Sequence, residues 1–480
     1  MRARREVVIE LVLLGAVLLA AGALFAQGLA IPADYDEGSY LAAVDALRGG
    51  QELGSEIFTP QPPGFYYLLA AGDAVTGGSL DGVRAEVIAL ALAGCVAAFL
   101  VGRLVAGPVA GLAAAALLAV AHPYPAFASR VSADLPALVL ALFSLACLLA
   151  AVTRPRGSPV LAAAAGVLFV AAVSVKLSAL TVAVPLAAFA LVRPPARRDL
   201  ALAGTGAAVA TLAFLLGHLG QLEGLWHGAV SYHGAARDVP GPGLRDNAEH
   251  FGHLIDPRTR NALFWLAPLG LAATVALARR GVALRLPLWP LWLWAVVGEG
   301  FLLWHRPLHD NHDVLLAVSL ALPVGIAVGA VLDRLPSGRT LAAGAGVVTL
   351  VLAGGFVEEV RDQRGLHASE PAEVTWAAEQ LRARTGPDDL IAVDRPIIAV
   401  LAGRRLPGDL VDTAYLRFRS GYLTPEHVLD EIDRVDVRAV VTARAFRDQP
   451  WLLAGLRARF PTRVSRGGVT LYLRPPALSG

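Results

Sequence analysis

The feature that most constrains this chain is a series of long apolar windows separated by short polar connections. Eleven windows recur, at residues 7–29, 84–104, 108–124, 133–152, 158–175, 177–192, 199–219, 262–279, 286–304, 312–332 and 339–357. A helix of about 20 apolar residues is long enough to cross the hydrocarbon core of a bilayer. The composition agrees, since 56% of the 480 residues are hydrophobic and 17% are charged. The sequence therefore predicts an α-helical polytopic membrane protein with about eleven transmembrane helices.

Arginine placement predicts the orientation of these helices, because cytoplasmic loops are enriched in basic residues. If the N-terminal segment MRARRE is cytoplasmic, alternate connections should be rich in arginine. They are, with Arg103, Arg154, Arg156, Arg193, Arg197, Arg198, Arg279, Arg280, Arg285, Arg334 and Arg339. All eleven histidines then fall on the outward side. We predict a multi-pass protein of the inner (plasma) membrane, with a cytoplasmic N-terminus and an extracytoplasmic C-terminus. The first window is predicted to be an uncleaved helix, with a cleaved signal peptide as the alternative.

The composition changes near residue 358, where charged residues become more frequent and the Gly/Ala runs end. Beyond it, DLIAVD (389–394) and VRAVVTA (437–443) have the pattern of buried strands, and TPEHVLDEIDRV begins with a threonine suited to cap a helix. We therefore predict a transmembrane catalytic domain at 1–357 and a soluble extracytoplasmic α/β domain at 358–480.

Polar residues on the outward side form the candidate site. The stretch DYDEGSY (34–40) places three carboxylates directly after the first window, at the start of a short helix predicted to end at Arg48. A carboxylate beside apolar walls can accept a proton from a hydroxyl, and the alternative is that these acids only cap the helix. Lys176 is the single lysine of the chain and lies at an apolar helix end. It is predicted to contact a phosphate, to anchor the helix at the interface or to pair with Asp134.

Histidines are concentrated in two outward segments, HRPLHDNHD (305–313) and the long connection predicted as a loop at 217–261. His309 and Asp313 are four residues apart and would share a helix face, so a divalent metal is possible. No HExxH or paired-cysteine pattern supports zinc, so no metal ligand is assigned and no cofactor is predicted. Cys95 and Cys147 lie inside apolar runs, which predicts neither a disulfide nor a metal site. A net charge of +2 without a basic patch predicts no nucleic-acid partner.

Taken in order, several motifs resemble the GT-C integral-membrane glycosyltransferases of the protein O-mannosyltransferase and aminoarabinose-transferase type (glycosyltransferase family 39). They are DYDEGSY, TPQPPGFYYLL (59–69), Arg84 at the start of the second window, SRVSADLPALVLAL (129–142), AGVLFVAAVSVKLSAL (165–180) and RPLHDNHDVLLAVSLAL (306–322). The resemblance covers the whole membrane region. One departure is Gln61, because such proteins often have lysine or histidine directly before the proline pair.

The resemblance implies an inverting hexosyl- or pentosyltransferase of the cell envelope. It would move a sugar from a polyprenyl-phosphate donor to a glycan, lipid or protein acceptor on the extracytoplasmic face, within membrane lipid. The catalytic residues would be Asp36 as general base, Glu37 beside it and Asp134 as a second acid. Donor-phosphate contacts would come from Lys176, Arg84, Arg130, His309 and His312, and acceptor or sugar contacts from Asp34, Tyr40, Gln61 and Tyr66.

Two other functions were compatible with the sequence: a transporter or flippase of lipid-linked sugars, and a non-catalytic scaffold for cell-envelope assembly. The chain has no paired repeat of broken helices, and its polar groups gather at one face instead of the midplane, which argues against a transporter. High alanine, glycine and arginine usage suggests a bacterial protein.

Overall fold

The computed structural model describes residues 2–154, 158–192, 196–241, 243–254, 261–336 and 338–474. Two of the predicted cytoplasmic arginines, Arg156 and Arg193, lie outside these residues. The chain divides into two compact units. The first comprises residues 1–29, 84–217 and 242–366, and the second comprises residues 30–83, 218–241 and 367–480.

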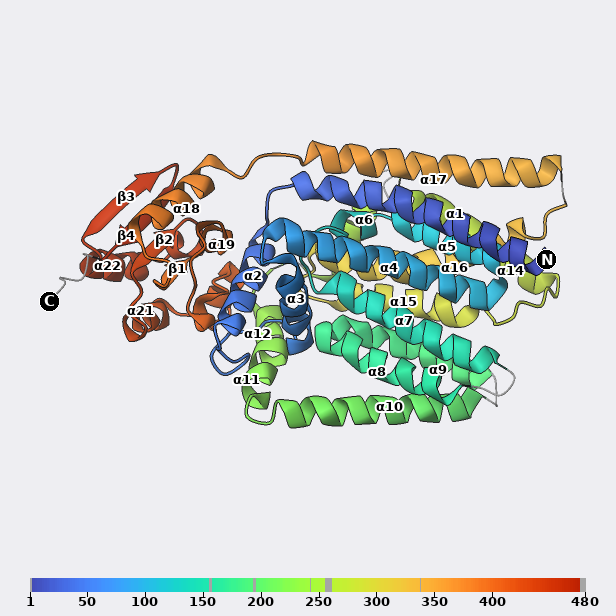
Figure 1. The fold of residues 1–480 in the computed structure, drawn as a ribbon, viewed down its shortest axis with the longest axis horizontal. Helices are drawn as coiled ribbons and strands as arrows, with labels where there is room; N and C mark the ends of the chain where they lie inside the picture. The colour runs from blue at the N-terminus through green and yellow to red at the C-terminus, as the bar shows by residue number, and fades with distance from the viewer. Residues whose placement is uncertain are drawn as a thin grey trace. The chain divides into compact units, whose positions relative to one another are not determined.

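The first unit is a bundle of apolar helices that run roughly parallel to one another (Figure 1). They are α1 (Arg2–Phe25), α4 (Leu80–Ala106), α5 (Pro108–Val120), α7 (Asp134–Thr153), α8 (Pro159–Val175), α9 (Ala183–Val192), α10 (Ala196–Gly217), α14 (Ala262–Arg279), α15 (Trp289–Trp304), α16 (Val314–Leu332) and α17 (Arg339–Gly365). Each predicted window contains one of them. Seven helices of the described residues are long and apolar enough to cross a membrane, and α5, α8 and the segment Leu177–Val192 are shorter apolar helices. The helical membrane fold is therefore confirmed, and the count of eleven spans stays a prediction.

Burial separates the helices of this bundle into inner and outer ones. The apolar window of α16 is 94% buried, and this helix packs against α5, α14 and α15. By contrast, the window of α17 is 6% buried, and on α10 the large side chains of Val209 and Leu212 are exposed. Exposing apolar surface to water costs about 25 cal/mol per Å². These outer faces are therefore suited to lipid, and the unit is a multi-pass membrane body.

The C-terminal part of the second unit is a small α/β layer. Its four-stranded sheet has the order β1-β2-β4-β3. Strand β1 (Ile391–Val393) is parallel to β2 (Ala439–Thr442), β4 (Val469–Leu473) is antiparallel to β2, and β3 (Thr462–Arg466) is antiparallel to β4. Helices α21 (Pro425–Arg434) and α22 (Pro450–Arg459) share a core with one face of this sheet. Thr424 caps α21 by accepting the His427 N–H at 3.2 Å. Both predicted strands and the predicted helix are confirmed.

The segment that follows the first helix belongs to this same unit. Helix α2 (Tyr35–Arg48) ends at the predicted residue and packs against α19 (Ile397–Ala402). A Cβ at Gly38 would stand 2.3 Å from the backbone nitrogen of Ile397, so only glycine permits this approach. Tyr35 OH also donates to Asp412 Oδ1 at 2.9 Å. The division predicted between residues 357 and 358 stays a prediction.

The connection predicted as a loop at 217–261 is largely helical in its described part. It forms α11 (Leu222–Trp226), a π-helical turn (His227–Ser231), α12 (Tyr232–Asp238) and α13 (Leu244–Leu254). The first three belong to the second unit and α13 to the first. Glycine and proline around residues 240–243 hid these short helices from the sequence pattern, because such residues are typical of loops.

Candidate functional site

The N-terminus of α2 carries the acids of the DYDEGSY motif. Asp34 is the N-cap residue, and its Oδ1 accepts the Glu37 N–H at 2.8 Å. In return, Glu37 Oε2 accepts the Asp34 N–H at 3.2 Å, which completes a capping box. Glu37 is buried, whereas Asp36 is exposed in the first helical turn. Asp34 and Glu37 therefore cap the helix, and Asp36 is an exposed residue of its first turn.

An aromatic wall follows these acids in the second unit. Gln61 Nε2 donates to Tyr40 OH at 3.2 Å, and both residues are buried. Tyr40 packs edge-to-face on Phe65, with ring centroids 4.8 Å apart, and also touches Tyr66. Burial raises the pKa of the Tyr66 phenol well above its ordinary value, and the carboxylates of Asp412 and Asp36 raise it further. The phenol is therefore neutral at physiological pH and lies within electrostatic range of Asp36.

A buried ion pair lies in the first unit, where α7 begins and α8 ends. Lys176 Nζ is 3.4 Å from Asp134 Oδ2, and Asn311 Nδ2 donates to the same oxygen at 2.9 Å. The Asp134 side chain is 2% exposed and that of Lys176 is 12% exposed. A buried pair of this kind is stable only when both charges are well compensated. The ion pair considered for Lys176 is thus present, and its ammonium keeps a small exposed surface.

The other residues predicted to contact phosphate also belong to the first unit. His309 is exposed, and desolvation together with the nearby Lys176 ammonium lowers the pKa of its imidazole. His312 is buried, and its Nδ1 accepts the His309 N–H at 3.2 Å. Arg84 is buried and donates to the Leu29 carbonyl at 3.4 Å. The Arg130 guanidinium lies 5.4 Å from the ring centroid of Phe127. The lowered pKa favours the neutral form of the His309 imidazole at pH 7.

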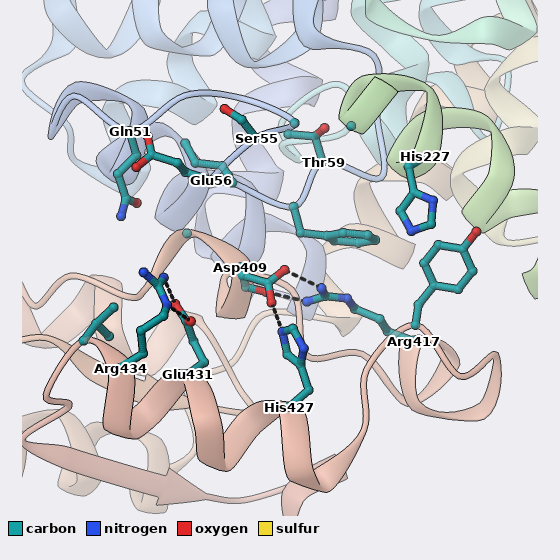
Figure 2. Close-up of a pocket in the computed structure, with 17 residues that line it drawn as sticks. Gln51, Ser55, Glu56, Thr59, His227, Asp409, Arg417, His427, Glu431 and Arg434 are labelled. Atoms are coloured by element: carbon teal, nitrogen blue, oxygen red, sulfur yellow. Dashed lines mark hydrogen bonds and ion pairs between the residues drawn. The ribbon is translucent and has the colours of Figure 1, made fainter. Parts of the chain in front are cut away.

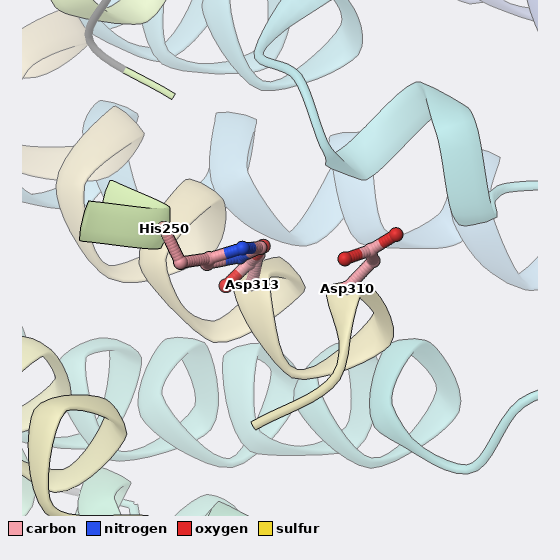
Figure 3. Close-up of side chains that lie close together, drawn as sticks. All are labelled: His250, Asp310 and Asp313. Atoms are coloured by element: carbon pink, nitrogen blue, oxygen red, sulfur yellow. The ribbon is translucent and has the colours of Figure 1, made fainter. Parts of the chain in front are cut away.

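A second cluster of ionisable groups lies close to Asn311. Figure 3 shows His250 of α13 pointing toward Asp313, with Asp310 nearby on the 3-10 turn Asp310–Asp313. His250 Nε2 is 2.6 Å from Asp313 Oδ2, and one ligand atom of each residue lies within 4.8 Å of the other two. The sequence paired Asp313 with His309 as a possible metal site, but the structure groups it with His250. His250 was missed because helix packing, not spacing along the chain, brings it there.

The predicted site residues fall into one group in each unit. Those in the second unit are Asp34, Asp36, Glu37, Tyr40, Gln61 and Tyr66, and those in the first are Arg84, Arg130, Asp134, Lys176, His309 and His312. Their chemical roles stay predictions. Each group combines a carboxylate with residues that can donate hydrogen bonds, as expected for recognition of sugar hydroxyls or phosphate.

Comparison with known proteins identifies the class of the fold. The sequence model of the dolichyl-phosphate-mannose-protein mannosyltransferase family matches residues 60–218. No curated protein matches the chain in sequence. Among solved structures, ArnT from Cupriavidus metallidurans bound to undecaprenyl phosphate is similar over 98% of this chain and 99% of its own, with a TM-score of 0.72 and 15% identity.

Other similar structures are also membrane glycosyltransferases. The oligosaccharyltransferase AglB from Archaeoglobus fulgidus, in complex with an inhibitory peptide and a dolichol-phosphate, is similar over 97% of this chain and 75% of its own, with a TM-score of 0.57 and 13% identity. The mycobacterial arabinofuranosyltransferase AftD matches 95% of this chain and 41% of its own, with a TM-score of 0.52 and 15% identity. The chain therefore has the GT-C fold, and the resemblance inferred from its motifs is confirmed. The match to the ArnT structure extends along nearly the whole chain.

Proposed function

We propose that this protein is an inverting membrane glycosyltransferase. It transfers a sugar from a polyprenyl-phosphate-linked donor to an acceptor hydroxyl on the extracytoplasmic face of the inner membrane. The observation that carries the proposal is the similarity, along nearly the whole chain, to an ArnT structure bound to undecaprenyl phosphate. The family-model match at 60–218 supports the same reaction class. It begins within the PPG-containing motif after the first external acids.

The proposed reaction needs a general base for the acceptor and a positive group for the phosphate. Asp36 of the second unit takes the proton from the acceptor hydroxyl, and the acceptor oxygen attacks the anomeric carbon of the sugar. The bond from that carbon to the phosphate oxygen breaks, and polyprenyl phosphate leaves with the electron pair. Lys176, which pairs with Asp134, is the proposed contact of the departing phosphate, since a positive group stabilises the developing charge. Glu37 holds the helix start on which Asp36 lies.

The proposal is tested by incubating the purified full chain in detergent with a panel of polyprenyl-phosphate sugars and candidate acceptors. We expect one donor to be consumed, with release of polyprenyl phosphate and formation of a product of inverted anomeric configuration. Mass spectrometry of the lipid fraction measures the release of polyprenyl phosphate, and NMR of the product determines its anomeric configuration. Movement of intact donor across liposomes without release of phosphate would instead indicate a transporter, and donor that stays unchanged with every acceptor would contradict the enzyme proposal.

We also propose that His250, Asp310 and Asp313 can hold a divalent cation. An imidazole nitrogen and two carboxylate oxygens form a suitable ligand set for such an ion, and a bound ion would add positive charge near Asn311. We expect saturating Mn²⁺ or Zn²⁺ to raise the unfolding temperature of the chelator-treated protein. Binding at about 100 times Kd stabilises a protein by about 2.7 kcal/mol.

The matched variants for this test are His250→Ala and His253→Ala, two histidines of the same helix α13. The rise in unfolding temperature with metal should disappear in His250→Ala and persist in His253→Ala. Thermal unfolding with several divalent cations measures this rise and does not require an active enzyme. If no cation raises the unfolding temperature of the wild-type protein, the cluster binds no metal and His250 and Asp313 only form a hydrogen bond.

A further inference from the structure

The second unit holds a cavity of ≈ 530 Å³ that the proposed reaction does not use (Figure 2). Three parts of the chain line it: residues 51–59 after α2, Gly224 and His227 of the outward connection, and the 408–435 region of the α/β layer. Small-molecule sites typically have volumes of about 300–1,000 Å³. The cavity is therefore large enough to hold a ligand of two or more rings.

Five of the ionisable side chains of this cavity form two groups, and Glu56 stands apart, since its carboxylate accepts the Glu52 N–H at 2.8 Å. Arg417 Nη2 donates to Asp409 Oδ1 at 2.6 Å, and His427 contacts the other oxygen of the same carboxylate. At another part of the cavity, Arg434 Nε and Nη2 each lie 2.7 Å from a Glu431 oxygen. The charges within these groups offset each other, and the remaining Glu56 carboxylate disfavours an anionic ligand. Guanidinium, imidazole and carboxylate groups that are fixed in this way can hydrogen-bond to a ligand with many neutral polar groups.

Aromatic rings lie beside these polar pairs. The His227 ring stacks on Tyr422 with centroids 4.6 Å apart, and the Arg417 guanidinium lies 3.7 Å from the ring centroid of Phe58. Tyr232 packs edge-to-face on both Phe58 and Tyr422, at 5.4 Å and 5.3 Å. A sugar ring has an apolar C–H face and a rim of hydroxyls, so it can stack on one set of side chains and hydrogen-bond to the other.

The Tyr232 phenol of this aromatic cluster is buried among charged groups. Burial raises the pKa of the Tyr232 phenol; Asp412 and Asp36 add to the increase, and Arg417 opposes it. Asp36 and Arg417 therefore both lie within electrostatic range of the same ring. The cavity and the proposed base belong to one compact unit.

We propose that this cavity binds a neutral glycan segment of the acceptor, at a distance of one or more sugar rings from the hydroxyl that is glycosylated. The assignment to the acceptor rests on the proposed function, whereas the binding of a polyhydroxylated ligand does not. The cavity would thereby select acceptors by the sugars that precede the reacting one.

The test uses the full chain in detergent and two cavity variants, Tyr422→Ala and Ser55→Trp. The first removes a stacking face and the second places a large ring at the exposed rim of the cavity. Tyr415→Ala is the matched control, because Tyr415 is an exposed tyrosine of the same unit that does not line the cavity. Isothermal titration calorimetry with lipid-free neutral tri- and tetrasaccharides of glucose, mannose, galactose and arabinose measures binding directly.

We expect at least one of these oligosaccharides to bind the wild-type protein. The Kd should rise about tenfold in Tyr422→Ala and in Ser55→Trp, as loss of an aromatic contact predicts, and should not change in Tyr415→Ala. In the transfer assay the two cavity variants should raise the KM for a glycan acceptor and leave the KM for donor unchanged.

The outcomes separate this inference from the proposed function. Wild-type protein that consumes donor but binds no oligosaccharide would overturn the proposed glycan site. An oligosaccharide Kd of Ser55→Trp equal to that of the wild-type protein would overturn it as well. Binding of a peptide or of inorganic phosphate in place of the oligosaccharides would overturn it too. Oligosaccharide binding by a protein that consumes no donor would uphold the site and overturn its assignment to an acceptor.

Discussion

Replacing Asp36 with asparagine is expected to lower kcat for sugar transfer by about 10²–10⁴-fold, which is the usual contribution of a positioned general base. Asparagine has nearly the same shape but cannot take a proton from the acceptor. The fold should survive, because Asp34 and Glu37 form the capping box and Asp36 is exposed. The initial rate of polyprenyl phosphate release at saturating donor and acceptor measures the loss, and thermal unfolding measures stability.

Three further variants of α2 make this result specific. Asp45→Asn changes another exposed acid of the same helix and should keep the wild-type rate. Asp34→Ala removes the N-cap and should lower the free energy of unfolding by about 1 kcal/mol. Glu37→Gln should have a small effect, because glutamine can also complete a capping box. An Asp36→Asn protein with near-normal kcat would remove Asp36 from the role of base.

Removing the charge of Lys176 is expected to have the second-largest effect. Lys176→Gln leaves the buried Asp134 carboxylate without its cation, and breaking a buried pair costs about 3–5 kcal/mol. If the ammonium also contacts the donor phosphate, kcat/KM for the donor should fall by a further factor of about 10–100, since a charged hydrogen bond contributes about 1.5–3 kcal/mol. Unfolding temperature and donor kinetics in the same detergent measure the two effects separately.

A double-mutant cycle with Asp134→Asn distinguishes the two roles of Lys176. The double variant carries no uncompensated buried charge, so its unfolding temperature should recover toward that of the wild type. Its donor kcat/KM should stay low, because the phosphate contact is still missing. Recovery of both properties together would show that Lys176 serves only as the partner of Asp134.

The membrane unit could be predicted from the sequence because apolar length alone decides whether a helix spans a bilayer. What hydropathy could not predict is the position of each helix in the bundle. The apolar windows of α16 and α17 look alike in sequence, yet one is 94% buried and the other 6% buried. In the α/β layer, β1 and β2 were predicted because every residue in them is buried, whereas β3 was missed because TRVSR is mostly exposed and polar.

For the candidate site, local chemistry was visible in the sequence and long-range packing was not. The sequence singled out the acids of DYDEGSY by residue type, and it gave the pairing of Lys176 with Asp134 as one of three alternatives. The contact of His250 with Asp313 joins residues 63 positions apart, and no periodic signal marks it. The cavity beside Phe58 and Tyr422 was missed for the same reason, since its wall combines three distant segments.

The close approach at Gly38 has a consequence for how the C-terminal region can be studied. Helix α2 packs closely against Ile397. Tyr35 OH donates to Asp412, and the Ala33 N–H donates to Glu370. Truncation of the chain after residue 366 would therefore remove the residues against which the DYDEGSY segment packs. Loss of sugar transfer in such a shortened protein would be explained by displacement of the proposed base, Asp36. It would not show that the C-terminal region itself contacts the sugar.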